Sequence, residues 1–402
     1  MNRKPTGTTL LRWAAELALA LIVVLIAIQL MDSYPGTDDR SGGIGPSDGA
    51  ARTVSLAELG LVEDSRPLRD RPGWEPPRKV VVMDMWPGRT AGIGDAAPGL
   101  EVVVAATEAA AAAAVVDADA LLGALTPTLF EAGTRLRWIQ LPAAGVERFL
   151  AIPGLADRDL VLTNAQRIFA PGGAEHVLAL ALALTRRIPL SLELQRDRSW
   201  DAHAVTGPTP YTGSGSELRE LRGRTMLIAG LGGIGTETAR LAHGIGMRVT
   251  ATRNSSRDGP EFVDYVGLAD EFETLAAEAD VVVNTLPLTA DTEGMFDAAM
   301  FASLKPGALF INIGRGRTVD TDALVAALRE GRLAGAGLDV TDPEPLPAGH
   351  PLWGMSNVII TPHVGGDSDG HMERMYLLFE ENLRRFAAGD PLLSVVDPAR
   401  GY

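Results

Sequence analysis

Short apolar runs alternate with helical stretches along most of the chain. Five runs predict β-strands at residues 79–85, 100–106, 118–125, 136–142 and 160–166. A second set of runs predicts strands at 224–231, 247–253, 280–287, 307–314, 333–340 and 357–363. Strands that alternate with helices favour parallel sheets with helices on their faces, so we expect an α/β fold.

A long apolar stretch at 172–194 separates the two sets and predicts a helix that joins two lobes. The chain has 402 residues, which exceeds the usual size of one domain and favours two domains with a cleft between them. We place the first domain at 78–185, with residues 366–402 returning to it. The second domain is expected at 186–365.

The amino-terminal 31 residues predict a membrane anchor. Trp13 to Met31 is apolar except for Glu16 and Gln29, and a helix of this length spans roughly 28 Å, close to the hydrocarbon thickness of a bilayer. A cleaved signal peptide is the alternative, but small residues at a cleavage site are missing after Ile28. We therefore predict a single-pass transmembrane helix, followed by a linker at 32–77 that begins with a stretch rich in Gly, Ser, Asp and Pro.

The charge balance and the residue counts exclude several classes of function. Thirty-six basic and fifty-one acidic side chains give a net charge of −15, which argues against a nucleic-acid partner. The absence of cysteine excludes disulfides, thiolate catalysis and cysteine-ligated metals. The six histidines do not pair at metal-ligand spacing, so we expect no metal site.

A glycine-rich loop follows the first predicted strand of the second domain. The stretch "LIAGLGGIGTETAR" (227–240) contains the pattern GxGxxG at Gly230, Gly232 and Gly235 and leads into a predicted helix. The three glycines allow a tight turn, close approach of backbone N–H groups to a pyrophosphate, and close helix packing. Gly233 and Ile234 lie inside this loop, which predicts a dinucleotide site at the helix N-terminus.

The end of the next strand indicates which dinucleotide binds. A carboxylate is expected about 20 residues after the glycine loop in NAD sites, where it binds ribose hydroxyls. This chain instead has Arg253 there, followed by Asn254 and Ser255, and no carboxylate occurs before Asp258. A guanidinium and hydroxyl donors suit a 2′-phosphate, so we expect NADP(H) to be preferred over NAD(H).

Polar residues also follow later strands of the second domain, at the sheet edge where ligands bind in open α/β folds. They are Arg315 in "FINIGRGRTVD", Asp339 and Glu344 in "AGLDVTDPEPLP", and His363 in "NVIITPHVGG". Together with "NTLPLTADTEGMF" (284–296) and "NAQRIFAPGGAEHVLALAL" (164–182), these stretches resemble the D-isomer-specific 2-hydroxyacid dehydrogenases, which include glyoxylate/hydroxypyruvate reductases and phosphoglycerate dehydrogenases. The resemblance covers about Leu136 to Asp397.

The resemblance implies two Rossmann-like domains, a substrate domain and a dinucleotide domain, and a hydride transfer between NADPH and a small 2-oxoacid that gives a D-2-hydroxy acid. Arg315 would bind the substrate carboxylate and polarise the 2-oxo group. His363 would donate a proton to the oxygen, and Glu344, five residues after Asp339, would stabilise the charged imidazole in preference to Asp342.

The remaining site residues also come from the resemblance. Backbone groups of Ala144 and Gly145 would bind the substrate carboxylate, and no side chain of the loop 141–149 indicates a particular substrate. The predicted cofactor contacts outside the glycine loop and the Arg253 stretch are Leu286, Pro287, Ile313, Gly314 and Asp339. His176 is expected to pack or to form a hydrogen bond.

Three further expectations concern partners and location. The apolar face of the helix around 175–190 would join two subunits, since dimers are usual in this family. An alternative function is a dinucleotide-sensing binding protein of the same fold without turnover. Basic residues before the predicted span place the catalytic domain outside the cytoplasm, whereas reduced nicotinamide pools are cytoplasmic. These two indications conflict, so the sequence does not assign the side of the membrane.

Overall fold

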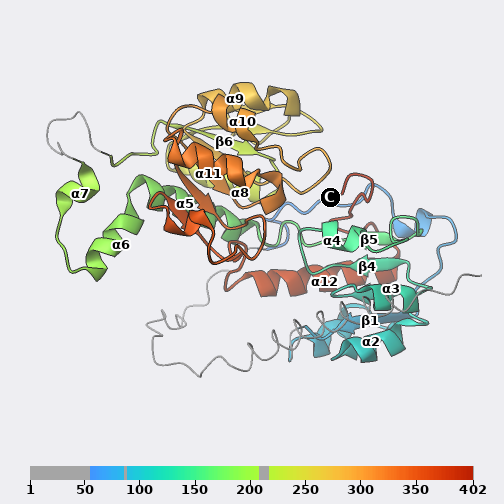
Figure 1. Ribbon diagram of the computed structural model, residues 1–402. Helices are drawn as coiled ribbons and strands as arrows, with labels where there is room; N and C mark the ends of the chain where they lie inside the picture. Colours follow the sequence, from blue (N-terminus) through green and yellow to red (C-terminus); the bar gives the residue numbers. More distant parts are fainter. Residues whose placement is uncertain (1–54, 86–87, 208–216, 402) are drawn as a thin grey trace, which may run out of the picture. The chain divides into compact units, whose positions relative to one another are not determined.

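Two parallel β-sheets organise the chain (Figure 1). The computed structural model describes residues 55–85, 88–207 and 217–401. One sheet is built from the strands before residue 164 and the other from the strands after residue 224. Two parallel sheets, each with helices packed on it, agree with the α/β fold class predicted from the sequence pattern.

The first sheet has five parallel strands in the order β2-β1-β3-β4-β5. Val80 and Val82 face one buried cluster and Val81 faces another, so both faces of the sheet are covered. Covering both faces explains why these strands are continuous apolar runs instead of alternating ones. The strands are β1 (Lys79–Met83), β2 (Glu101–Ala105), β3 (Ala120–Leu122), β4 (Trp138–Gln140) and β5 (Val161–Thr163).

The second sheet has seven parallel strands in the order β12-β11-β10-β9-β6-β7-β8. The strand order reverses between β6 and β9, and ligands bind at such a switch point outside the carboxyl ends of the strands. Strand β8 is not predicted by the sequence pattern because its residues, Tyr265 to Gly267, are not part of a long apolar run. The strands are β6 (Thr225–Ala229), β7 (Arg248–Thr252), β8 (Tyr265–Gly267), β9 (Val281–Asn284), β10 (Ala308–Asn312), β11 (Leu333–Leu338) and β12 (Val358–Ile360).

Helices cover both faces of each sheet. Helices α2 and α3 pack on one face of the first sheet, and the late helix α12 packs on its other face through Leu378, Phe379 and Leu383. On the second sheet, α9, α10 and α11 lie opposite α5 and α8. The helices are α2 (Glu108–Val115), α3 (Pro127–Ala132), α4 (Glu147–Leu150), α5 (Ala170–Thr185), α6 (Ile188–Arg196), α7 (Ala202–Thr206), α8 (Gly233–Gly244), α9 (Phe272–Glu278), α10 (Ala298–Ser303), α11 (Thr321–Arg329) and α12 (His371–Ala388).

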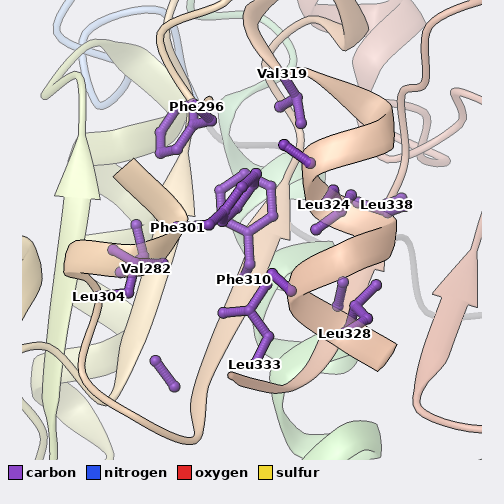
Figure 2. Close-up of a cluster of buried hydrophobic side chains, with 14 of the residues drawn as sticks. Val282, Phe296, Phe301, Leu304, Phe310, Val319, Leu324, Leu328, Leu333 and Leu338 are labelled. Carbon is purple, nitrogen blue, oxygen red and sulfur yellow. The ribbon is translucent and has the colours of Figure 1, made fainter. Parts of the chain in front are cut away.

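An aromatic cluster forms the core on one face of the second sheet (Figure 2). Phe296 packs against Phe310 with ring centroids 4.9 Å apart, and Phe301 meets Phe310 edge to face at 5.4 Å. Burying several large rings contributes much of the stability of a lobe of this size. This core supports β9 and β10, whose ends carry the polar residues described below.

The connection between the sheets differs from the single helix predicted at 172–194. The chain turns at Arg187, which has a left-handed backbone conformation with φ of 52°, and α6 then begins at Ile188 with Pro189 in its first turn. A left-handed residue followed by a proline cannot continue a helix. In addition, Val177 and Leu180 of α5 belong to the core of the second sheet, although residue 185 was the expected end of the first domain.

The predicted membrane localisation requires a correction. The segment Trp13–Met31 lies outside the described residues. Within residues 55–85, 88–207 and 217–401, no helix is long and apolar enough to cross a membrane. The prediction of a single-pass membrane protein is therefore wrong for the part of the chain that the structure describes.

Candidate active site

A cavity of about 640 Å³ is lined by residues from loops of both lobes, that is, from segments that follow strands of the first sheet and of the second. The first lobe contributes the loop from Pro142 to Arg148, and the second lobe contributes the residues that follow β10, β11 and β12. Arg315, Glu344 and His363 all line this cavity. The structure thus brings together three side chains that are up to 48 positions apart in the sequence.

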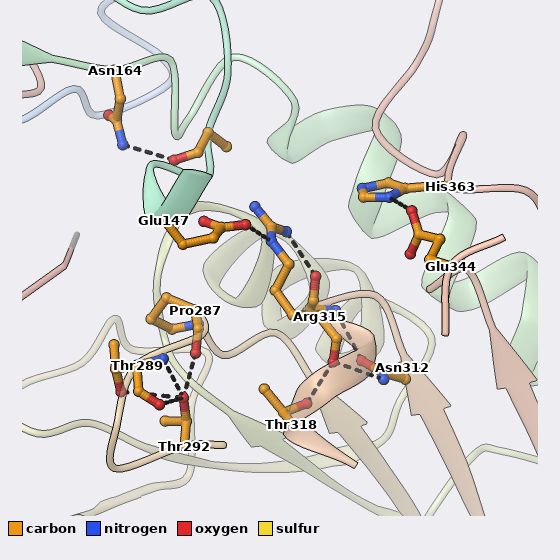
Figure 3. A network of polar contacts seen from close by, with 12 residues as sticks. Glu147, Asn164, Pro287, Thr289, Thr292, Asn312, Arg315, Thr318, Glu344 and His363 are labelled. Atoms are coloured by element: carbon orange, nitrogen blue, oxygen red, sulfur yellow. Dashed lines mark hydrogen bonds and ion pairs between the residues drawn. The ribbon is translucent and has the colours of Figure 1, made fainter. Parts of the chain in front are cut away.

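The backbone of Arg315 is held by a buried polar network behind the cavity (Figure 3). The side chains of Asn312 and Thr318 donate hydrogen bonds to the Arg315 carbonyl over 3.2 and 2.6 Å. Asn284 at the end of β9 in turn donates to both of these side chains. Because Asn284, Asn312 and Thr318 are almost completely buried, the network fixes the loop that presents Arg315.

The guanidinium of Arg315 reaches across the cleft to the first lobe. Its Nε donates a 2.7 Å hydrogen bond to Oε1 of Glu147, the first residue of α4, and its Nη1 donates to the Gly314 carbonyl. Burial raises the pKa of Glu147, but the charge of Arg315 and the hydrogen bond from it together lower the pKa by more than burial raises it. The pKa of Glu147 therefore lies below its ordinary value. Glu147 is therefore an anion that neutralises Arg315 in the cleft.

His363 and Glu344 form the second polar pair of the cavity (Figure 3). The Nδ1 of His363 lies 2.6 Å from Oε1 of Glu344, and the two side chains are 48% and 43% exposed. This contact leaves Nε2 of the imidazole available to a ligand. Glu344, and not Asp342, thus makes the contact with His363 that the resemblance implied.

Asp339 fixes the turn that carries His363. Its carboxylate accepts hydrogen bonds from the backbone N–H groups of Val364 and Gly365, and its carbonyl accepts from the N–H of His363. These bonds support the left-handed conformation of His363, whose φ is 55°. Asp339 is only 2% exposed and lines the cavity that contains His363.

Ala144 and Gly145 lie in the loop opposite Arg315. The side chain of Asn164 donates a 2.8 Å hydrogen bond to the Ala144 carbonyl and so holds this loop after β4 (Figure 3). A Cβ atom at Gly145 would lie 1.7 Å from Nη2 of Arg315 and 2.7 Å from Oε2 of Glu147. A side chain at position 145 would therefore displace the guanidinium or the carboxylate, and glycine lets both approach the loop closely.

A second cavity of about 340 Å³ surrounds the glycine loop between β6 and α8. Its lining includes Ala144, Gly145 and Arg315, which also line the first cavity, so the two cavities adjoin. All the predicted cofactor residues except Asp339 line it: Gly230, Gly232, Gly233, Ile234, Gly235, Arg253, Asn254, Ser255, Leu286, Pro287, Ile313 and Gly314. The contact predicted between Asp339 and the cofactor stays a prediction.

The glycine loop has the shape that a dinucleotide requires. A Cβ at Gly235 would lie 2.1 Å from the Gly230 carbonyl, whereas a Cβ at Gly232 would meet no atom within 4 Å. Gly232 precedes the first residue of α8, so its open side leaves room for a pyrophosphate at the helix N-terminus. Gly230 has a φ of 92°, which favours glycine at this turn.

Besides Arg315, two arginines line the second cavity, one from each lobe. Arg253 follows β7 and donates a hydrogen bond to the Asp258 carbonyl, and Arg167 lies with its Cγ beside Gly233. Burial lowers the pKa of Arg167, and the like charge of Arg253 lowers it further. The cavity is thus electrostatically suited to an anion.

Among the charged residues of these cavities that sequence reasoning missed are Glu147 and Arg167. Glu147 lies in the loop 141–149, whose side chains indicate no particular substrate, and its carboxylate two residues after Gly145 is the signal that marks it. Arg167 lies inside a stretch that was quoted only for its resemblance. His176 donates or accepts a hydrogen bond with the Thr361 hydroxyl over 2.9 Å, as expected for a structural role.

Comparison with known proteins identifies the family. Residues 178–365 match the family model described as "D-isomer specific 2-hydroxyacid dehydrogenase, NAD binding domain". A glyoxylate reductase from Pyrococcus furiosus is 34% identical over 69% of this chain and 81% of its own length. A glyoxylate/hydroxypyruvate reductase B from Escherichia fergusonii is 33% identical over 71% of this chain and 87% of its own.

Solved structures give the same result. An NADPH-dependent glyoxylate/hydroxypyruvate reductase from Sinorhizobium meliloti, in complex with NADP and sulfate, matches with a TM-score of 0.68 and 29% identity, covering 81% of this chain and 100% of that one. A family member from Xanthobacter autotrophicus, in complex with NADPH and MES, matches with a TM-score of 0.68 and 30% identity, over 82% and 100%. The chain belongs to the D-isomer specific 2-hydroxyacid dehydrogenase family of NAD(P)-dependent oxidoreductases.

Proposed function

We propose that this protein reduces a small 2-oxoacid with NADPH and releases a D-2-hydroxy acid. The observation that carries this proposal is the adjoining pair of cavities: Arg315 lines both, His363 and Glu344 line one, and the glycine loop lines the other. A substrate bound at Arg315 would therefore lie next to the dinucleotide. Relatives named as glyoxylate reductases support a small 2-oxoacid as the substrate.

The side chains of the first cavity divide the chemistry between them. Arg315 offers a planar set of N–H donors to the substrate carboxylate and to the 2-oxo oxygen, and it stabilises negative charge as that oxygen is reduced. His363 donates its proton to the same oxygen, so the product is a neutral hydroxyl. When bound, the reduced nicotinamide supplies the hydride to the 2-oxo carbon.

Glu344 has a positioning role in this scheme. Its contact with Nδ1 of His363 fixes the ring and stabilises the protonated imidazole, which is the form that reduction consumes. The opposite lobe provides backbone groups of Ala144 and Gly145 near the substrate carboxylate. Steady-state reduction of glyoxylate and of hydroxypyruvate, with chiral analysis of the glycerate formed, tests the proposal; absence of turnover or an L-product would contradict it.

The preference for NADP(H) rests on the surroundings of Arg253. No carboxylate lies between the end of β7 and Asp258, and Arg253, Asn254 and Ser255 line the cavity. A 2′-phosphate near Arg253 and Arg167 would reduce the repulsion between the two guanidinium groups. Complexes of two related structures with NADPH or NADP agree with this preference.

We expect Arg253→Asp to reverse the cofactor preference. Loss of a charge-assisted contact with the phosphate should cost about 1.5–3 kcal/mol, which lowers kcat/KM for NADPH by about ten- to a hundredfold. Arg257→Gln is the matched control because Arg257 pairs with Glu271 and does not line the cavity. Equal kcat/KM values of the wild type for NADPH and NADH would contradict the proposal.

We also propose a homodimer and a division into domains. Ile188 and Leu192 of α6 are almost half exposed and Trp200 is fully exposed, which supports a subunit interface along α5, α6 and the following residues. The molar mass in solution, from light scattering, tests this.

The substrate domain would include residues 78–169 and 366–402, and the dinucleotide domain would begin with α5, because α5 packs on the second sheet.

A further inference from the structure

Glu147 occupies the place where a substrate carboxylate would be expected. Its Oε1 accepts the Nε–H of Arg315, and its Oε2 lies beside Gly145, where a Cβ would be 2.7 Å away. Arg315 and the Gly145 loop are the two groups proposed to bind the substrate carboxylate. The side chain of Glu147 therefore presents a carboxylate to both halves of that site.

Glu147 takes one of the two edges of the Arg315 guanidinium that can bind a carboxylate through two hydrogen bonds. Nε is used by Glu147 and Nη1 donates to the Gly314 carbonyl. A bidentate carboxylate needs two adjacent N–H groups of the guanidinium, so Glu147 blocks the edge formed by Nε and Nη2, and a ligand carboxylate has to use the edge formed by Nη1 and Nη2. Two carboxylates on one guanidinium also repel each other, because the site is partly shielded from water.

We propose that Glu147 is an internal competitor for Arg315 and thereby sets the affinity and selectivity of the site for carboxylate substrates. The proposal rests on the proposed role of Arg315 in substrate binding. Glu147 neutralises Arg315 in the free enzyme, so inorganic anions bind weakly there. A 2-oxoacid exchanges with the Glu147 carboxylate because it gains contacts at His363 as well as at Arg315.

A merely structural ion pair would behave differently. If Glu147 only oriented Arg315, its removal would weaken substrate binding, since the guanidinium would lose a partner that fixes it. If Glu147 competes with the substrate, its removal strengthens the binding of any carboxylate. The sign of the change in affinity therefore separates the two roles.

The experiment compares the full-length wild type with Glu147→Gln. Binding of oxamate, a non-reducible analogue of 2-oxoacids, is measured by calorimetry with NADP⁺ present, and inhibition by chloride is measured with glyoxylate as substrate. We expect Glu147→Gln to lower the Kd of oxamate and the KM of glyoxylate by about tenfold, the scale of one partly shielded charge pair. Chloride should inhibit the variant at lower concentration than the wild type.

Two further variants control the comparison. Glu147→Asp keeps the charge and should stay close to the wild type. Glu293→Gln removes the same charge from the ion pair with Arg317, which also lines the first cavity, and should leave the Kd of oxamate unchanged. A higher Kd for oxamate in Glu147→Gln, or an unchanged one, overturns the proposal.

Failure of the proposed function would be recognised separately. Absence of 2-oxoacid reduction by the wild type contradicts the proposed function, whereas the oxamate measurement does not depend on turnover. If the wild type binds no oxamate, binding gained by Glu147→Gln supports internal competition. If neither protein binds oxamate, the proposal is wrong.

Discussion

The two polar halves of the substrate cavity are built differently. Arg315 is held through its backbone by Asn312 and Thr318, its guanidinium is paired with Glu147, and its side chain is 25% exposed. His363 is about half exposed, and its side chain has a single polar contact, with Glu344. The first half is supported by a buried network, and the second rests on one pair and a turn fixed by Asp339.

This difference matches the tasks that we propose for the halves. A group that binds a carboxylate works best when its donors are fixed in advance, because no orientation has to be gained during the reaction. A group that donates and regains a proton must exchange it with solvent in each turnover, and exposure of the imidazole allows this. We therefore expect variants of the two halves to affect different kinetic constants.

The largest effect is expected from His363→Ala. Loss of the general acid should lower kcat for 2-oxoacid reduction by about 10²–10⁴-fold, while the Kd of NADPH, measured by fluorescence, stays nearly the same because His363 does not line the dinucleotide cavity. A fall in kcat smaller than tenfold would mean that solvent or another side chain donates the proton.

Arg315→Lys should affect mainly the binding half. An ammonium group cannot reproduce the planar set of donors, so one or more charge-assisted hydrogen bonds are lost, at about 1.5–3 kcal/mol each. We expect kcat/KM for glyoxylate to fall by about ten- to a hundredfold, with a large part of the loss in KM. The kinetics of the variant with saturating NADPH provide the measurement, and an unchanged KM would contradict a role in carboxylate binding.

The sequence predicted the supporting structure of both halves better than their contacts. Apolar runs such as Val80–Val82 and Val281–Val283 are fully buried strands, and a strand covered on both faces leaves a pattern that periodicity detects. Arg315, Glu344 and His363 each follow a strand of one sheet, at the edge where ligands bind, and the family resemblance singled them out and implied their roles. The cavity contains all three.

Contacts between the lobes could not be predicted in this way. Glu147 and Arg315 are 168 positions apart and come from different sheets, so neither periodicity nor spacing relates them. The same limitation affects α5, whose apolar residues could cover either sheet and in fact cover the second. Asp339 was expected at the cofactor from the family resemblance; its carboxylate binds backbone N–H groups of the His363 turn, and a contact with the cofactor stays a prediction.

A smaller effect is expected from Glu344→Gln. The amide still accepts a hydrogen bond from the imidazole but supplies no charge to stabilise its protonated form, so kcat for reduction should fall by about tenfold, the value of one charged hydrogen bond. Asp342→Asn is the matched control two residues away, because Asp342 is not the partner of His363. The pair is compared by kcat at saturating glyoxylate, and an equal loss in both variants would remove the distinction between the two acids.

The smallest effect concerns stability and tests whether the two lobes are joined at Arg315. The pKa of Glu147 lies below its ordinary value of 4.5, so its ion pair with Arg315 stabilises the fold fully above pH 4.5 and loses this contribution as the pH falls through the lower, folded value. Glu147→Gln has no carboxylate to titrate. The difference in thermal midpoint between wild type and variant, measured by calorimetry, should therefore be present at pH 7 and shrink below pH 4.5. We expect a small difference, because one third of the Glu147 side chain is exposed and salt screens the pair. A difference that stays constant as the pH is lowered would show that the carboxylate of Glu147 does not stabilise the contact between the lobes.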